Sequence, residues 1–193
     1  MSKSPKADDR ELAELALQLG RVAYADSCAG GLTHGQSAAL RFFARANRFS
    51  RTVSAFADYH ATTRATASQT TSTLVDRGYL TRHRSQRDGR STRFDLTRRS
   101  RKLLEADSFE SVVAAAEQLA PSARGTTARC LRTMLTELAA VGGRSLFGLC
   151  PMCQHLQIVK AQTRKSYACR LLGEPLQTEE VSQICARFLP KAG

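Results

Sequence analysis

The chain has 193 residues, of which 42% are hydrophobic, and this composition can bury one core and is not that of a disordered protein. Its 29 Lys and Arg against 17 Asp and Glu give a net charge of +12, an excess that attracts polyanions, of which nucleic acid is the usual one. No apolar run is long enough to span a bilayer and the polar start lacks the apolar core of a signal peptide, so we expect a cytoplasmic protein without a membrane partner.

Three helical signals open the chain. Leucines at helical spacing predict a helix from about Leu12 to Val22, ended by a run that contains two glycines. Thr33 is placed to cap a second helix, and Thr52 to cap a third, short one that ends near Ala61. The short step from the third helix to the next one is typical of a helix-turn-helix.

The stretch from Thr63 to Thr97 predicts a DNA-reading unit, which with the third helix covers residues 52–97. Thr63 can cap a helix that Gly78 ends. That helix begins with short polar groups that suit phosphates and base edges in a major groove. These groups are Thr66, Ser68, Gln69 and Thr70.

A basic hairpin follows this helix. Residues 79–82 and 93–96 alternate apolar and polar side chains as two short strands do, and Asp88-Gly89 supplies a tight turn between them. Arginines gather inside the hairpin and just after it, and Arg84, Arg87 and Arg90 are candidate contacts to DNA. A turn-tip arginine beside an acidic neighbour suits a narrow, electronegative minor groove, which favours Arg90 among the three.

Two helices are predicted after the hairpin. Apolar spacing indicates one long helix that runs through Leu104 and Leu119 and ends at Pro121. A further helix carries Leu131 and Leu138, and Gly142-Gly143 closes it. Cys130 falls on the apolar face of this last helix, where we expect burial in a dimer core.

Four short motifs support a resemblance to a known family. They are Leu32-Thr33-x-x-Gln36, Val53-Ser54-Ala55-Phe56-Ala57, Thr66-x-Ser68, and Gln86-Arg87-Asp88-Gly89-Arg90-Ser91 followed by Leu96-Thr97. From about Leu12 to about Val141 the chain resembles the MarR family of winged-helix transcription regulators. Thr70, Thr71 and Ser100 depart from the family pattern, and Ser100 stands where a glycine is usual, which predicts a less tightly packed recognition helix.

The resemblance implies a fold and a function. The fold is mainly α, a winged helix-turn-helix with long dimerisation helices. The function is that of a sequence-specific DNA-binding regulator, expected to be a repressor and not an enzyme. Its partners are a second copy of the chain, joined through the first and last helices, and double-stranded DNA with a pseudo-palindromic operator. In the family the wing aspartate holds an arginine in the minor groove, and the matching residues here are Asp88 and Arg90.

The chain continues beyond this MarR-like domain of residues 1–143. Residues 144–193 form an extension, here called the cysteine tail, which holds four of the six cysteines in the spacing C-x2-C-x15-C-x15-C. A Cys-x-x-Cys turn can present two thiolates to one metal, and two later cysteines can complete a four-thiolate shell. The tail therefore predicts a small metal module whose ligands are Cys150, Cys153, Cys169 and Cys185.

The spacing leaves the nature of this centre open. An iron-sulfur cluster is favoured for two reasons. It tolerates one close pair with two distant single cysteines, and the run Cys185-Ala-Arg-Phe-Leu-Pro resembles the terminal ligand turns of cluster-binding tails. Zinc is the next alternative, although zinc sites usually bring two Cys-x-x-Cys pairs. A thiol switch or unliganded cysteines complete the alternatives, since disulfides are less favoured in a reducing cytoplasm.

We expect the centre, or its redox state, to control DNA binding through a tail packed on the dimerisation helices. One alternative is a MarR-type regulator that senses a small aromatic molecule between its dimerisation and DNA-binding parts and uses zinc only structurally. An alternative of another class is a thiol-dependent oxidoreductase.

Overall fold

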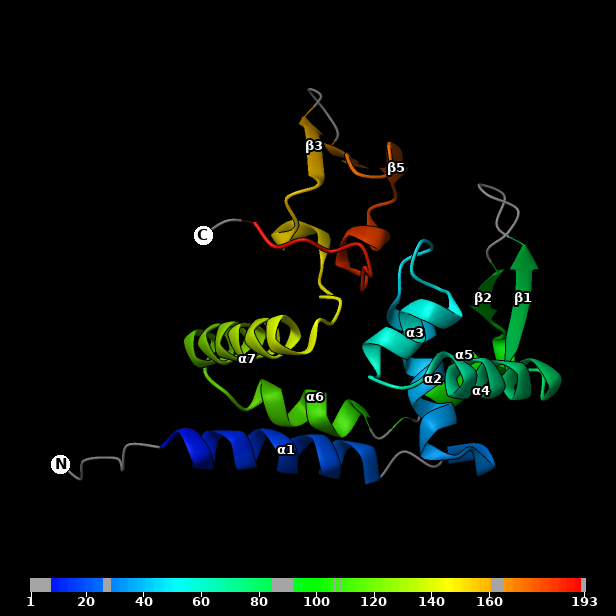
Figure 1. Cartoon of the computed structure of the whole chain (residues 1–193), viewed down its shortest axis with the longest axis horizontal. Coiled ribbons are helices and arrows are strands. Elements are labelled where there is room, and N and C mark those ends of the chain that lie inside the picture. The colour runs from blue at the N-terminus through cyan, green and yellow to red at the C-terminus, as the bar shows by residue number, and fades with distance from the viewer. Residues whose placement is uncertain are drawn as a thin grey trace.

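The computed structural model of the chain describes residues 8–25, 29–84, 92–105, 107, 109–160 and 165–191. A winged helix lies on the right of Figure 1, a helical arm on the lower left, and a small C-terminal sheet above them. The helices are α1 (Asp9–Ala25), α2 (His34–Arg45), α3 (Val53–Tyr59), α4 (Arg64–Asp76), α5 (Arg98–Leu104), α6 (Phe109–Glu117) and α7 (Pro121–Gly142). The strands are β1 (Leu80–Arg84), β2 (Thr92–Leu96), β3 (Leu156–Lys160), β4 (Lys165–Cys169) and β5 (Glu174–Leu176).

The predicted helix starts are confirmed, because the side-chain oxygen of each cap residue accepts a hydrogen bond from the backbone N–H of the third residue after it. Thr33 accepts from Gln36, whose side chain in turn accepts from the backbone of Thr33, so the two form a capping box. Thr52 and Thr63 accept in the same way at the starts of α3 and α4. Gly143 closes α7 in the left-handed region with φ 59°, a conformation that favours glycine.

The main core lies where α2, α3, α4 and the base of the wing meet. Phe43 is fully buried and stacks on Phe42 and Phe94, with ring centroids 5.4 and 5.6 Å apart. Leu74 from the inner face of α4 and Leu80 from β1 close the same cluster. The helix-turn-helix and the wing therefore share one core, and this core fixes the recognition helix relative to the wing.

Two predictions about the middle of the chain need correction. The first wing strand covers 80–84 where 79–82 was predicted, and the second covers 92–96 where 93–96 was predicted. The single long helix through Leu104 and Leu119 is wrong, because the chain forms two helices, α5 and α6. Asp107 lies between them, where its carboxylate accepts the backbone N–H of Phe109 and two hydrogen bonds from Arg41 at 2.5 and 2.7 Å. A bidentate pair to α2 thus anchors the break between the helices.

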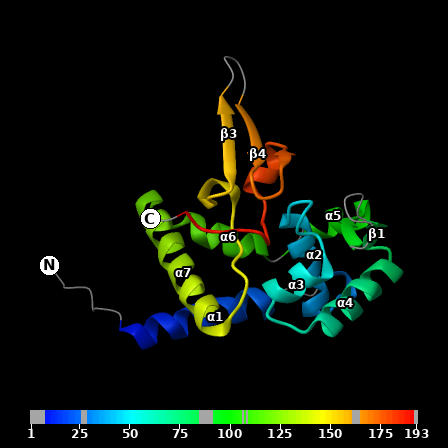
Figure 2. The same cartoon turned by 45° about the horizontal axis from the view of Figure 1, so that its top comes forward.

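Helices α1, α6 and α7 form an arm to one side of the winged helix (Figures 1 and 2). Their apolar side chains remain uncovered in the single chain, as Leu15 on α1 is 53% exposed and Val141 on α7 is 89% exposed. Leu135 and Leu138 on α7 are exposed to a similar degree. So many large apolar side chains exposed on one group of helices are typical of a surface that a partner covers.

The cysteine tail contains a sheet that the sequence patterns did not predict. Strands β3, β4 and β5 pair antiparallel in chain order, with Leu156 opposite Cys169 and Tyr167 opposite Leu176. Residues 161–164 between β3 and β4 lie outside the described residues. None of the described helices is both long and apolar enough to cross a lipid bilayer.

His60, at the end of α3, gives a prediction about pH. Its ring packs among Phe42, Phe56 and Tyr59, and its Nε2 is buried without a hydrogen-bond partner among the described residues. Burial lowers the pKa of His60, with a smaller lowering by Arg41 and an opposing hydrogen bond to the backbone of Ala38. The folded protein therefore binds this proton less readily than the unfolded chain does.

The free energy of unfolding should consequently fall as the pH drops below the unfolded pKa of about 6.5 and level off below the lowered folded pKa. Urea titrations at pH 7.5 and pH 5.5 measure this loss. A His60→Gln variant should lose less stability between the two pH values than the parent, whereas His83→Gln, at an exposed wing position, should lose as much. An equal loss in the parent and in His60→Gln would contradict the prediction.

Candidate nucleic-acid interface and cysteine cluster

Helix α4 has a buried inner face and an exposed polar outer face. Ala67 and Leu74 are fully buried, and Thr71 is 1% exposed. The outer face presents the residues that the sequence predicts as DNA contacts. Of these, Thr63, Thr66, Ser68 and Gln69 are exposed and Thr70 is half-buried.

The hydroxyl groups on this face are not equally available. The Thr63 oxygen accepts the backbone N–H of Thr66 at 3.1 Å and lies 2.8 Å from the Thr66 hydroxyl. Thr70 donates its hydroxyl proton to the carbonyl oxygen of Thr66 at 2.9 Å. In contrast, the side chains of Ser68 and Gln69 make no hydrogen bond within the described part of the chain. Ser68 and Gln69 therefore keep their full hydrogen-bonding capacity for a ligand.

The wing supplies positive charge beside α4. Strands β1 and β2 pair in register, with Arg84 opposite Thr92 at the end of the described hairpin. Arg82 and Arg84 are exposed, and the Arg82 guanidinium lies 5.8 Å from the centre of the Phe94 ring. The predicted contacts Arg87, Asp88 and Arg90 lie outside the described residues.

Of the three departures from the family pattern, Thr71 and Ser100 are buried with hydrogen-bonded hydroxyl groups, so the structure does not show the looser recognition helix that was predicted from these two residues. Thr71 donates to the carbonyl oxygens of Ala67 and Ser68 at 3.0 and 2.9 Å, which replaces apolar packing with internal hydrogen bonds. Ser100 is fully buried and donates its hydroxyl to the carbonyl oxygen of Tyr79. Thr70 bonds back to its own helix, as described above.

One residue of this interface was missed from the sequence. Arg64 is the first residue of α4 and is exposed next to the cap residue Thr63. Its position directly after a threonine cap could have identified it, because a cation at the end of a recognition helix is well placed for a phosphate. Arg64, like Arg82 and Arg84 of the wing, adds an exposed positive charge to this candidate interface.

Backbone pairing brings the four tail cysteines to one end of the small sheet. Cys150 and Cys153 share one tight turn, in which the Cys153 N–H donates to the Cys150 carbonyl oxygen at 2.9 Å. Cys169 ends β4 opposite Leu156, three residues after Cys153. Cys185 pairs with Gly148, two residues before Cys150, and its N–H donates to the Gly148 carbonyl oxygen at 2.9 Å.

The four cysteines of this cluster form no disulfide with one another, and three of them are buried. Cys150, Cys153 and Cys185 are 6 to 8% exposed, and Cys169 is half-buried. The Cys185 sulfur accepts the backbone N–H of Arg187 at 3.3 Å, a contact that also suits a thiolate. Nevertheless, among the described residues no three His, Cys, Asp or Glu side chains converge closely enough to hold a metal ion as they stand.

The electrostatics of Cys150 reflect this crowding. Burial raises the pKa of the Cys150 thiol to about 11, with further contributions from Cys185, Cys153, Cys169 and Glu180. A thiol with so high a pKa is protonated near neutral pH and is a poor nucleophile. This argues against Cys150 as the attacking group of a thiol oxidoreductase. Cys130 is exposed on α7 of the single chain, and Cys28 lies outside the described residues.

The cysteine tail also contacts the loop between α2 and α3, residues 46–52, called here the α2–α3 loop. Ile184 pairs with Ala46, and Glu180 forms an ion pair with Arg48 at 2.5 Å. The tail was expected to pack on the dimerisation helices. These contacts connect it to the loop that leads into the DNA-reading unit, and the start of the tail also lines a pocket with α7.

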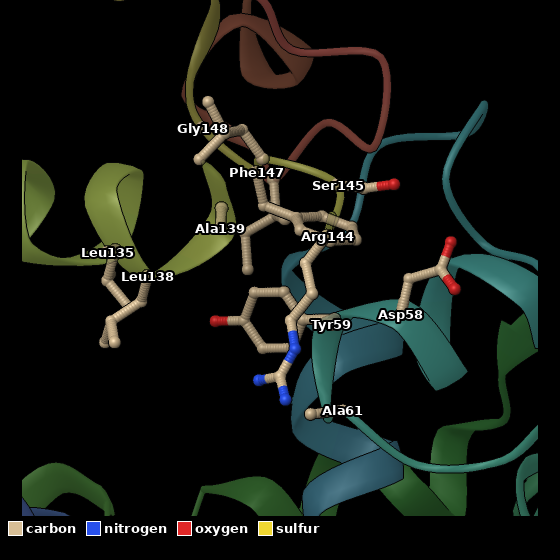
Figure 3. Close-up of a pocket in the computed structure, with 12 residues that line it drawn as sticks. Asp58, Tyr59, Ala61, Leu135, Leu138, Ala139, Arg144, Ser145, Phe147 and Gly148 are labelled. Atoms are coloured by element: carbon tan, nitrogen blue, oxygen red, sulfur yellow. The ribbon is translucent and has the colours of Figure 1, made fainter. Parts of the chain in front are cut away.

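A pocket of about 440 Å³ lies between α3, α7 and the start of the tail. Figure 3 shows Tyr59 from α3 beside Arg144 and Phe147, with Leu135 and Leu138 of α7 across from them. The Tyr59 and Phe147 rings meet edge to face with centroids 5.1 Å apart. The walls are mostly apolar and aromatic, and two charged residues, Asp58 and Arg144, also line the pocket. Such a lining suits a small aromatic molecule, whose acidic group would pair with Arg144.

Known proteins resemble the winged-helix part of the chain. Residues 30–91 match the sequence model of the MarR family. A MarR transcriptional regulator from Methanosarcina mazei Go1 is 21% identical, with a TM-score of 0.54 over 69% of this chain and 99% of that one. A MarR family regulator from Streptomyces coelicolor, solved in complex with DNA, is 17% identical, with a TM-score of 0.52 over 72% of this chain and 92% of that one. The regulator BldR from Sulfolobus solfataricus is 17% identical, with a TM-score of 0.52 over 69% and 99%. No curated protein matches the chain.

Proposed function

We propose that the protein is a regulator of the MarR type, a sequence-specific DNA-binding regulator of transcription and not an enzyme, because residues 30–91 match the MarR family model and the fold resembles that of MarR regulators. The observation that carries the proposal is the outer face of α4, where Ser68 and Gln69 are exposed with unused hydrogen-bonding groups beside a basic wing. Groups of this kind can read base edges once a helix lies in the major groove. The likeness to the S. coelicolor protein in complex with DNA supports the same use of the fold. Such a protein would act in the cytoplasm, as a repressor.

We propose that the active form is a homodimer joined through the arm. The apolar residues of α1 and α7 are exposed to water in the single chain, which is unfavourable. A second copy of the chain can bury them, because it presents an equivalent apolar face. Two recognition helices related by a two-fold axis would then meet successive major grooves. The operator is therefore a pseudo-palindrome whose half-sites lie about one helical turn apart.

A titration of the full-length protein against genomic DNA fragments tests this proposal. We expect one class of fragments with a pseudo-palindrome to bind far more tightly than the rest. Because several arginines approach phosphates, the affinity for that class should fall by about a thousandfold or more between 50 and 200 mM salt. Weak binding without any preferred sequence would contradict the proposal that the protein is a sequence-specific regulator.

We further propose that the four tail cysteines hold a metal centre, an iron-sulfur cluster or zinc, whose state controls DNA binding. The proposal is supported by their gathering at one end of the sheet, by the burial of three of them and by the N–H group that faces the Cys185 sulfur. The tail is also short, and folded segments of about fifty residues usually depend on a cross-link such as a bound metal for their stability. Small movements of the side chains would have to complete the shell, because the described residues do not enclose an ion as they stand.

Metal and acid-labile sulfide analysis of protein purified without oxygen separates the possibilities. A cluster gives iron with sulfide and a brown colour, and a zinc site gives a colourless protein with about one zinc per chain. Protein without either metal would contradict the proposed centre while leaving the DNA-binding proposal intact.

A second candidate function is suggested by the pocket beside Tyr59 and Arg144. A small aromatic anion could bind there and regulate DNA binding, with the tail metal only structural. Calorimetric titration of aromatic carboxylates distinguishes this case, since Arg144→Ala should weaken their binding and leave the metal content unchanged.

A further inference from the structure

The segment around Cys185 is hydrogen-bonded on both sides of the cysteine to the end of α2 and to the α2–α3 loop, which leads into the DNA-reading unit. On one side, the Ile184 N–H donates to the Arg45 carbonyl oxygen at 2.7 Å, and the Ile184 carbonyl oxygen accepts the Asn47 N–H at 2.9 Å. On the other side, the Ala186 N–H donates to the Ser50 hydroxyl oxygen at 2.8 Å. The backbone that would carry one metal ligand is thus hydrogen-bonded to the α2–α3 loop immediately before and after that ligand.

The loop ends of these hydrogen bonds are buried and the tail ends are half-buried, which makes the bonds costly to break. Ser50 is fully buried and donates its own proton to the Asn47 side-chain oxygen at 2.7 Å, and Asn47 is 1% exposed. Loss of the tail contact would leave the buried Ser50 hydroxyl and Asn47 N–H of the loop without these partners. The loop and the Cys185 segment therefore move together or separate at a substantial cost.

An ion pair adds a second connection. Glu180 is 6% exposed, and its carboxylate accepts from Arg48 at 2.5 Å and from the Gln177 N–H at 2.9 Å. Arg48 also donates to the Pro175 carbonyl oxygen at 2.6 Å, at the strand β5 that pairs with β4. Arg48 thus links the α2–α3 loop to the part of the tail that carries Cys169.

The same loop continues to the wing. The Arg51 carbonyl oxygen accepts the Phe94 N–H at 3.0 Å, and the Arg51 guanidinium donates to the Asp95 carboxylate at 2.5 Å. Arg51 also donates to the Ala46 carbonyl oxygen at 2.9 Å, which ties the two ends of the loop together. Strand β2 of the wing is therefore held by the loop that holds the Cys185 segment.

We infer that the α2–α3 loop, through Arg48, Ser50 and Arg51, transmits the state of the cysteine centre to the wing of the same chain. This inference rests on the proposed metal centre and on the proposed DNA binding. Filling the centre fixes the position of Cys185, which holds the loop and through it the base of β2. Emptying the centre releases Cys185, so the loop and the wing lose part of their support. Regulation then acts on the wing within one protomer and does not require a change in the spacing of the two recognition helices.

Hydrogen exchange on the full-length protein tests the first half of this path without any substitution. Protein loaded with Zn²⁺ is compared with the same protein stripped by a chelator, and metal content is measured on both samples. We expect stripping to speed exchange at least tenfold at the amides of Asn47, Ala186 and Phe94. Metal loss with unchanged exchange at Asn47 and Phe94 would overturn the inference. A parent that takes up no Zn²⁺ would overturn it together with the proposed centre, and the metal analysis tells the two failures apart.

A double variant, Arg48→Gln with Ser50→Ala, tests the second half. It removes the ion pair and the serine bridge but no cysteine, so its metal content should equal that of the parent. Stripping should weaken DNA binding at least tenfold in the parent and less than twofold in this variant. The matched control is Arg170→Gln with Ser182→Ala, which removes the same charge and hydroxyl from exposed tail positions and should respond as the parent does.

Equal responses to stripping in the double variant and in the parent would contradict the path through the loop. Arg48→Gln and Ser50→Ala are also measured singly, so that a poorly folded double variant does not decide the outcome. If none of the proteins binds DNA with a preferred sequence, the proposed function fails, whereas the exchange experiment still reports on the connection between the tail and the wing.

Discussion

Serine in place of Cys150, Cys153, Cys169 or Cys185 should remove most of the metal from the protein. A four-thiolate centre loses most of its affinity with any one ligand, because three thiolates and a hydroxyl bind zinc or iron far less tightly. The tail has little apolar surface of its own, and Ile158, Val159 and Leu171 are all more than half exposed. Metal loss should therefore also loosen the tail, and protease digestion should cleave it faster in the four variants than in the parent.

The matched control is Cys130→Ser, because this cysteine is exposed on α7 and distant in sequence from the four. Elemental analysis of five variants and the parent, prepared in the same way, gives the comparison. The control should keep the parental metal content and parental resistance to protease. Parental metal content in any of the other four variants would show that its cysteine is not a ligand, and the proposed centre would need a different set.

Replacement of Gln69 by alanine should remove much of the sequence preference of DNA binding. Gln69 is exposed on the outer face of α4, and its amide has no partner within the described part of the chain, so it is free to bond a base edge. Loss of one good bidentate contact to a base costs about 1 to 3 kcal/mol, which corresponds to roughly a 5- to 150-fold weaker complex with the preferred site. Binding to unrelated DNA should change little, and competition titrations with both kinds of DNA measure the ratio.

Two further variants make this prediction specific. Gln157→Ala removes the same side chain from an exposed position on β3 and should leave both affinities unchanged. Arg64→Ala should weaken binding to all sequences about equally and reduce the salt dependence by about one charge, as expected for a phosphate contact. A Gln69→Ala protein with parental sequence preference would mean that other residues read the bases.

Much of the winged helix could be predicted from the sequence, because the signals involved are local. Thr33, Thr52 and Thr63 each cap a helix by a hydrogen bond that spans three residues, so the residue type and its neighbours suffice to find them. Gly78 and Gly143 take positive φ values where the patterns predict helix ends. The exposed face of α4 followed from the same periodicity, and with it the candidate residues Ser68 and Gln69.

The break between α5 and α6 shows where local signals fail. Apolar spacing is compatible with one continuous helix, and the contact of Asp107 with Arg41, 66 residues earlier, which anchors the break, leaves no local signal. The three-stranded sheet of the tail was missed for a related reason, since strands of three to five residues carry too short an alternation to stand out from loops.

The sequence by itself determined that four cysteines share one tail and that a basic winged helix precedes it. Only the tertiary structure decided what that tail touches. Arg48 meets Glu180 across 132 residues of chain, and the Ala186 N–H meets the Ser50 hydroxyl across 136. The sequence does not reveal whether a charged residue in a loop, or a serine before a helix, is exposed to water or contacts another segment of the chain. Which of the two they face depends on how all the segments pack together, and hydrogen bonds that become buried in that packing then fix the arrangement.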